Sequence, residues 1–230
     1  MDYKKLFHKE EAFQRETFQK RMEEFGFKNM ARMELFLWDL ELFLHIQKIL
    51  GDKIILKGGA ATQFYLPRDA QRTSVDIDML FFGTEEEIKE TLRKIEEYLG
   101  TEDELFYFHK HSPKNPKTNL PLHTYYMKVP SVLSNAERNM DRESIPYQEL
   151  KIEFILQPEK WEYERRTGEN IFAVNSSWNY QILPLNYLFA DKLTTLGCNT
   201  IGVQNERLDE QVKQFYDIMM LSRNCISEMQ

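Results

Sequence analysis

The chain has 230 residues, of which 42% are hydrophobic and 13% aromatic, so it can bury a core and wholesale disorder is excluded. Its net charge of -7, from 30 basic and 37 acidic residues, argues against a protein that coats DNA. It leaves room for RNA on a local basic patch. The length suits one compact domain with appendages, or a small protein of two lobes.

The cysteines and the N-terminal sequence bear on the compartment. Cys198 and Cys225 are too few and too widely spaced for a disulfide framework or a zinc site. The start, "MDYKKLFHKEEAFQRE", is charged throughout and lacks the apolar stretch of a signal peptide. No apolar run approaches the ~18 residues of a transmembrane helix. We therefore expect a soluble protein of the reducing cytoplasm, without membrane contact.

Helical patterns mark the beginning of the chain. Residues 8–28 are charged, with phenylalanines at intervals, which predicts an amphipathic helical arm. Residues 30–50 are apolar on most faces, which predicts a helix buried between layers. Gly51 suits a left-handed C-cap of that helix. We assign residues 1–50 to an N-terminal helical segment.

The centre of the chain alternates between strand and helix patterns. A buried strand, "KIILK" (53–57), ends in a pair of glycines, and a short helical piece follows. Residues 74–82 alternate with period 2 and predict a second strand. The clearest helix is 84–100, because Thr84 and Glu87 form a capping box ahead of one apolar stripe.

Further strands complete the predicted sheet. Residues 104–110 and 120–129 flank a polar loop and suggest a β-hairpin, and residues 149–156 predict another strand. Strands that alternate with helices favour a mixed sheet with helices against it. We expect an α+β fold with its core at 51–160.

The end of the chain has a helical pattern. Two helices are predicted at 184–197 and 206–223, after a connector at 158–170. We therefore expect residues 161–230 to form a C-terminal helical segment that packs on the core.

The glycine pair Gly58-Gly59 lies between a predicted strand and a predicted helix. This position offers free backbone N–H groups at a positive helix end, and glycine lets a phosphate approach the backbone closely. The signal alone is unspecific, because any tight strand-to-helix turn favours glycine. The spacing matches neither a P-loop nor the Gly-x-Gly-x-x-Gly fingerprint.

Two aspartates share one face of the strand that follows. Residues i and i+2 of a strand point the same way, so Asp76 and Asp78 aim two carboxylates at one place. Such a pair repels unless a cation lies between the two, and magnesium takes one or two carboxylates together with substrate phosphates. Two solvated acids on an exposed face are the alternative.

A third acid, Glu153, lies in the middle of an apolar strand, where Ile152 and Phe154 face the other side. A glutamate inside a sheet is costly unless it is paired or bound to a metal. The sequence therefore suggests a metal site of Asp76, Asp78 and Glu153. An edge strand on which Glu153 faces water is the alternative.

The order of these residues resembles the nucleotidyltransferase fold related to DNA polymerase beta, and more closely the AbiEii/AbiGii toxin family of abortive-infection and toxin–antitoxin systems. That family has Lys-Gly-Gly-Thr-Ala-Leu, a tyrosine, and then Arg-x-Ser-x-Asp-Ile-Asp. The matching stretches here are 57–61, Tyr65 and 72–78. The resemblance covers one long motif, whose order and spacing are more specific than either half. It implies a mixed nucleotidyltransferase sheet flanked by N- and C-terminal helices.

The C-terminal helices carry a second feature of this family. Ala190-Asp191-Lys192-Leu193 matches its Ala-x-Lys-Leu pattern, and Asp217 follows an aromatic pair as in its last motif. Lys192 lies on the apolar stripe of its helix, where a lysine needs an anionic partner such as a triphosphate. A lysine that snorkels at the edge of the stripe, and an ion pair of Asp217 with Lys213, are the alternatives.

Two positions depart from the family pattern. Ala60 replaces the threonine after the glycine pair, which removes one hydroxyl. The basic run before the last aspartate is reduced to Arg207, Lys213 and Gln214.

The resemblance implies metal-dependent nucleotidyl transfer from an NTP to an acceptor hydroxyl. Asp76, Asp78 and Glu153 would hold Mg²⁺ or Mn²⁺ and, with Lys192, form the catalytic set. The residues that the resemblance assigns to nucleotide binding are Lys57, Gly58, Gly59, Arg72, Ser74 and Asp217.

The implied acceptor is the 3′ end of tRNA or a protein hydroxyl, and a cognate antitoxin is an expected partner. The densest basic stretch, 109–117, is the first candidate to contact RNA phosphates. Its histidines, taken with His123, are poorly spaced for a metal, and a solvated hairpin tip is the alternative. The loop with Arg138 and Arg142 is the second candidate.

Two other functions remain open. A haloacid-dehalogenase-type phosphatase also begins with a strand carrying Asp-x-Asp, but that family requires Thr or Val where this chain has Leu80. The phosphatase family also lacks a glycine pair before that strand, whereas this chain has one. Alternatively, the chain keeps the fold and acts as a partner-binding module. The complete set of Asp76, Asp78 and Glu153 argues against that alternative.

Overall fold

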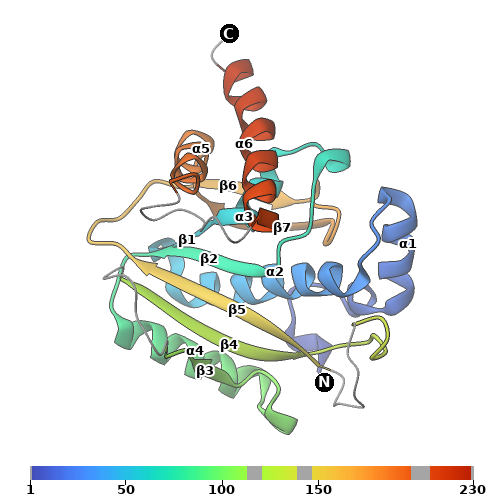
Figure 1. Ribbon diagram of the computed structural model, residues 1–230. Coiled ribbons are helices and arrows are strands. Elements are labelled where there is room, and N and C mark those ends of the chain that lie inside the picture. Colours follow the sequence, from blue (N-terminus) through green and yellow to red (C-terminus); the bar gives the residue numbers. More distant parts are fainter. Residues whose placement is uncertain (1, 113–120, 139–146, 198–207, 229–230) are drawn as a thin grey trace.

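The computed structural model describes residues 2–112, 121–138, 147–197 and 208–228. A mixed sheet of seven strands, in the order β3-β4-β5-β2-β1-β7-β6, forms its centre (Figure 1). The strands are β1 (Ile54–Lys57), β2 (Asp76–Phe81), β3 (Phe108–Lys110), β4 (Leu122–Pro130), β5 (Tyr147–Leu156), β6 (Glu164–Gly168) and β7 (Ser176–Ile182). The predicted α+β class with a mixed sheet is therefore confirmed.

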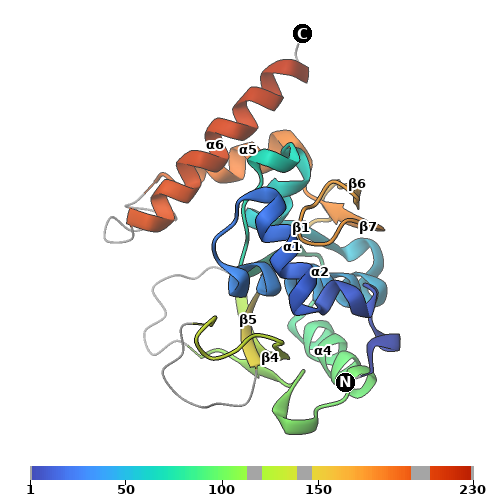
Figure 2. The same ribbon diagram turned by 90° about the vertical axis from the view of Figure 1, so that its right-hand side faces the viewer.

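The helices gather in two groups around this sheet. They are α1 (Arg15–Phe25), α2 (Met30–Leu50), α3 (Gly58–Thr62), α4 (Glu85–Leu99), α5 (Leu185–Thr194) and α6 (Leu208–Glu228). Helices α2 and α4 lie on one side of β4 and β5, whereas α5 and α6 lie together at another end of the molecule (Figure 2). None of the helices in the described ranges is long and apolar enough to cross a membrane.

Helix α2 is buried as its apolar sequence predicts. Phe36, Leu37 and Leu40 are fully buried, and the helix packs against β1, β2 and β5. The Asn29 side chain caps its start by accepting a hydrogen bond from the Arg32 N–H at 3.0 Å. At its end, Gly51 has φ of 60° but ψ of -129°, so the predicted left-handed helical C-cap is wrong although the positive φ does favour glycine.

Strand β2 lies between β1 and β5 and carries the predicted alternation. Ile77 and Met79 are fully buried on one side, so Asp76 and Asp78 point to the other side. Because β4 and β2 flank β5, Glu153 lies inside the sheet, and the edge-strand alternative is wrong.

The helix and hairpin predictions around this centre hold with small changes. The capping box of Thr84 and Glu87 opens α4, and β3 pairs antiparallel with β4 as predicted. The tip of that hairpin, 113–120, lies outside the described residues. The arm predicted at 8–28 is divided into a 3-10 turn at Glu10–Phe13 and α1.

Strands β6 and β7 were not predicted. They pair antiparallel, and β7 joins the sheet beside β1, so a purely helical segment from residue 161 is wrong for 164–182. The charged run Glu164-Arg165-Arg166 explains the miss, because an edge strand exposed to water lacks the apolar alternation that identifies a strand.

Candidate active site

The glycine pair forms a turn that contacts the predicted site residues directly. Gly58 has φ of 68°, and a Cβ placed on it would overlap the carboxylate of Asp78. A Cβ on Gly59 would lie 2.8 Å from Ser74 Oγ and 3.0 Å from an Arg72 guanidinium nitrogen. Only glycine allows this approach, so the turn from β1 into α3 is fitted against Asp78, Ser74 and Arg72.

The carboxylates converge through strand register. Asp78 lies opposite Glu153 of the parallel strand β5 and opposite Lys57 of the antiparallel strand β1. Burial raises the pKa of Asp78 to about 7, and the negative charge of Glu153 adds to this, while the charge of Lys57 opposes it. Asp78 and Glu153 are thus two neighbouring acids, and the charge of Lys57 offsets only part of the effect of burial and repulsion on Asp78.

Glu153 is held by two donors from neighbouring positions. The Thr124 hydroxyl donates to Glu153 Oε1 at 3.2 Å, and Lys151 Nζ lies 2.9 Å from the same oxygen. Burial lowers the pKa of Lys151, but the negative charges of Glu153, Asp76 and Asp78 outweigh burial and raise it. Lys151 was missed from the sequence, although its place two residues before Glu153 puts both on one face of β5.

This donor set fits a divalent ion that shares its ligands with a substrate. In the described part of the chain, no three Asp, Glu, His or Cys side chains are arranged to enclose a metal alone. Magnesium does not need such a cage, because it commonly takes one or two carboxylates and completes its shell with water and phosphate oxygens. The charge of Asp78, which is half-buried beside Glu153, is what such an ion would neutralise.

Asp217 joins two predicted cations on the other side of the glycine turn. Its carboxylate accepts from Arg72 Nε at 2.8 Å and Arg72 Nη2 at 2.6 Å, and Lys192 Nζ lies at 2.9 Å. The Asp217 side chain is fully buried. Burial raises the pKa of Asp217, but the hydrogen bonds and charges of Arg72 and Lys192 outweigh burial and hold it below its ordinary value.

This arrangement decides two alternatives left by the sequence. Lys192 is only 3% exposed, so it does not snorkel to the surface, and its ammonium group also donates to Gln214 Oε1 at 3.0 Å. Asp217 pairs with Arg72 and Lys192, so a simple surface pair of Asp217 with Lys213 is wrong.

Two further contacts fix the backbone around the turn. Lys57 Nζ forms an ion pair with Asp191 of α5 at 2.7 Å. Gln63, which the sequence analysis did not single out, donates to the Gly59 carbonyl at 2.8 Å and accepts from the Arg72 N–H at 2.8 Å. A buried amide at the end of a short helix has no distinctive sequence pattern, so nothing in the sequence marks Gln63.

The basic candidates for acceptor binding are only partly described. Lys110 pairs with Glu85 at 2.5 Å, and His123 lies 3.6 Å from the same carboxylate. Arg138 donates to the Tyr147 carbonyl at 2.6 Å. Residues 113–117 of the basic stretch, together with Arg142, Arg207 and the side chains of both cysteines, lie outside the described residues.

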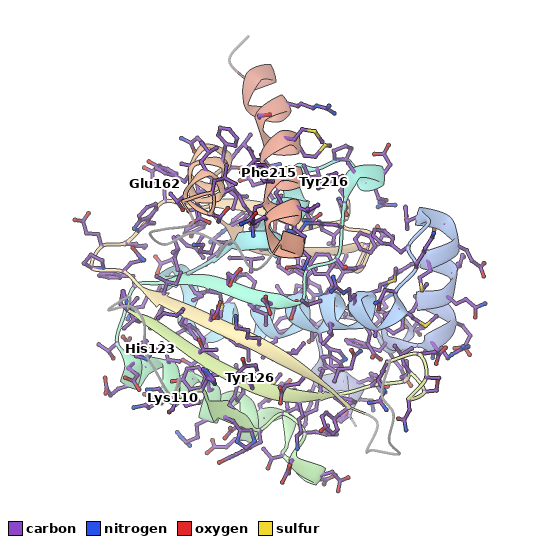
Figure 3. All side chains as sticks on the ribbon, viewed as in Figure 1. Lys110, His123, Tyr126, Glu162, Phe215 and Tyr216 are labelled. Carbon is purple, nitrogen blue, oxygen red and sulfur yellow. The ribbon has the colours of Figure 1, made fainter. Side chains whose placement is uncertain are left out.

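The acids open onto the side of the sheet that α2 and α4 leave free. Tyr126, which lies opposite Lys151 on β4, marks this face in Figure 3, and Tyr216 marks α6 above it. The Tyr216 hydroxyl donates to the Ala70 carbonyl at 2.7 Å, which ties α6 to the segment before Arg72. The site therefore has carboxylates on the sheet and an ion-paired cationic cluster beside the glycine turn.

The chain matches the sequence model of a known protein family. Residues 42–230 match the sequence model of the family described as "Nucleotidyl transferase AbiEii toxin, Type IV TA system". The comparison with curated proteins gave no match.

Two solved structures are similar to this chain at low sequence identity. The crystal structure of JHP933 from Helicobacter pylori has 14% identity and a TM-score of 0.51, over 85% of this chain and 68% of that chain. The crystal structure of the Megavirus polyadenylate synthase has 9% identity and a TM-score of 0.45, over 86% of this chain and 34% of that chain. The family match confirms the resemblance seen in the sequence, with the nucleotidyltransferase sheet at its centre.

Proposed function

Because the chain belongs to the AbiEii nucleotidyl transferase toxin family, we propose that it transfers a nucleotide from an NTP to an acceptor hydroxyl in a reaction that depends on Mg²⁺ or Mn²⁺. The observation that carries this proposal is the contact of the Gly58 turn with Asp78, which itself lies opposite Glu153. A bound divalent ion would neutralise triphosphate charge and stabilise the attacking and leaving oxygens.

Each group in the site has a role in this proposal. Asp76, Asp78 and Glu153 would hold the ion, and Glu153 would also take the proton of the acceptor hydroxyl. The remaining groups would bind the nucleotide phosphates through backbone amides, a hydroxyl and positive charges: Gly58, Gly59, Ser74, Lys57, Arg72 and Lys192. Asp217 would hold Arg72 and Lys192 beside the Gly58-Gly59 turn.

The acceptor and the biological setting are proposed from the resemblance to this family. We propose the 3′ end of tRNA or a protein hydroxyl as acceptor, a toxin function in the cytoplasm, and a cognate antitoxin as partner. A labelling reaction tests the enzyme. The protein is incubated with each α-³²P-labelled NTP, Mg²⁺ and total tRNA, and the label is followed on RNA and on protein.

Variants give this reaction its controls. Asp78→Asn should abolish labelling, whereas Glu97→Gln, which removes a carboxylate paired with Arg93 on the exposed face of α4, should leave it unchanged. No labelling by any NTP would contradict the enzyme. If Asp78→Asn also kept its toxicity in cells, the protein would act as a partner-binding module.

A further inference from the structure

Lys151 of β5 lies on the face that carries the three acids of the site, and its charge interacts with each of them. It lies opposite Asp76 in the β2–β5 register, and its neighbour on the same face of β5 is Glu153. Its Nζ is 2.9 Å from Glu153 Oε1. The charge of Lys57 also opposes the effect of burial on Asp78, but Lys57 already forms an ion pair with Asp191 at 2.7 Å.

The ion pair between Lys151 and Glu153 would contribute little to the stability of the fold if it acted alone. The Lys151 side chain is 34% exposed and the Glu153 side chain 18%, and such half-exposed pairs contribute little alone. Its effect is larger where it compensates several like charges at once. Asp76, Asp78 and Glu153 together form an acidic cluster that repels itself unless a cation is present.

We propose that Lys151 is a resident counter-cation that pairs with Glu153 while the metal site is empty and is displaced when a divalent ion binds. The displacement rests on the metal-dependent function proposed above, whereas the pairing in the metal-free protein does not. Lys151 and the ion compete for the same carboxylate, so Lys151 lowers the affinity of the site for metal. Once released, its ammonium group is free on the open face of the sheet beside Tyr126, which lies opposite Lys151 in the register.

Three variants separate this role from a local packing effect. Lys151→Met removes the charge and keeps the length of the side chain, and Lys151→Arg keeps the charge. Lys128→Met is the matched control, because Lys128 lies on the neighbouring strand and pairs with the exposed Glu104 away from the three acids. All measurements are made at pH 8.

The first measurement is thermal unfolding in EDTA. Lys151→Met should lower Tm by about 3–6 °C, because the three acids lose their counter-cation. Adding Glu153→Gln to Lys151→Met should restore most of the loss. Lys151→Arg and Lys128→Met should stay close to the wild type. An unchanged Tm of Lys151→Met would overturn the counter-cation role.

The second measurement is Mn²⁺ affinity by electron paramagnetic resonance. Lys151→Met should bind Mn²⁺ about fivefold more tightly, which corresponds to ~1 kcal/mol of removed charge repulsion. Equal or weaker binding than the wild type would overturn the competition. If neither the wild type nor any variant bound Mn²⁺, the proposed metal-dependent function and the displacement would both fail. In that case the thermal unfolding in EDTA would be the only test of the counter-cation role of Lys151.

Discussion

Gly58 approaches Asp78 so closely that a single methyl group on its Cα would overlap the aspartate carboxylate. Gly58 has a φ of 68°, and the Asp78 carboxylate can lie where it does only because residue 58 has no Cβ. Strands β1 and β2 are antiparallel neighbours, and Lys57 lies opposite Asp78 in their register. Gly58 follows Lys57 directly, so this register brings the Gly58 backbone close to the Asp78 carboxylate.

Replacing Gly58 by alanine should therefore disrupt the site more than the fold. A residue with a Cβ in this left-handed backbone conformation lowers the free energy of unfolding by about 1–2 kcal/mol. The displaced Asp78 should lower nucleotidyl transfer by about 100-fold, as misplacement of a reacting group by ~1 Å does. Urea unfolding and the labelling rate measure the two effects.

Gly26→Ala is the matched control for that variant. Gly26 has φ of 71°, close to that of Gly58, but nothing lies within 4 Å of an added Cβ. It should lose a similar amount of stability from backbone strain and keep full activity. Equal activities of the two variants would contradict the proposed role of the Gly58 contact.

Removing the charge of Asp217 should strongly destabilise the protein. Asp217→Asn leaves Arg72 and Lys192 without their buried anion, and losing one partner of a buried pair costs about 3–5 kcal/mol. Lys213→Met should have little effect, since Asp217 pairs with Arg72 and Lys192. Urea unfolding at pH 7 measures both variants. A large loss for Lys213→Met would contradict the observed pairing.

The pH dependence of this loss has a definite sign. The pKa of Asp217 is held below its ordinary value of 3.8, so the folded state binds fewer protons there than the unfolded state. The stabilisation is fully present above the unfolded pKa and disappears as the pH falls through the lower, folded pKa. The difference between wild type and Asp217→Asn should therefore be constant from pH 5 to 7 and shrink below about pH 4.

In the metal-free protein, Asp78 should give stability the opposite pH dependence to that of Asp217. Burial, with the charge of Glu153, raises its pKa to about 7, so the folded state holds a proton that the unfolded state has lost. Stability should fall as the pH rises from about 4 to 7. Asp78→Asn should lack this contribution to the fall, and Mg²⁺ should remove the same contribution from the wild type by favouring the charged carboxylate. Unfolding series in EDTA and in Mg²⁺ measure it; identical pH profiles of the two proteins would contradict it.

The sequence could predict the part of the site that depends on short-range periodicity. The period of 2 in β2 correctly placed Asp76 and Asp78 on one face, and the same rule applied to β5 would have found Lys151. The place of Glu153 in an apolar strand already suggested it, whereas Lys192 needed the family pattern as well, because helix docking is a long-range property. That Arg72 and Lys192 share Asp217 is invisible in a linear pattern, since three separate elements supply the charges.

The edge of the sheet was less predictable for a physical reason. Strands β6 and β7 follow a connector rich in charged residues, and β6 is an edge strand, so burial does not impose a clear alternation there. Trp178 of β7 is 45% exposed, and the Trp178 indole N–H donates to the Phe7 carbonyl of the N-terminal segment. That contact joins distant parts of the chain, and no local pattern specifies it.

Asp39 of α2 is a buried carboxyl that should cost stability. It is 1% exposed, and neither of its oxygens has a hydrogen-bond partner among the described residues. Burial raises its pKa well above the ordinary value, and the charges of Asp76 and Asp78 add to this. Because the folded state favours the protonated form, the cost grows as the pH rises above about 4.

Asp39→Leu should therefore raise the free energy of unfolding, by about 1–4 kcal/mol at pH 8. Glu41→Gln is the matched control, because Glu41 is equally buried on the same helix but accepts hydrogen bonds from the Phe7 N–H at 2.7 Å and the His8 N–H at 3.0 Å. It should lose about 3–5 kcal/mol. Urea unfolding of both variants at pH 5 and pH 8 decides the matter: the gain of Asp39→Leu should be larger at pH 8, and a loss at both values would show that the Asp39 carboxyl stabilises the fold.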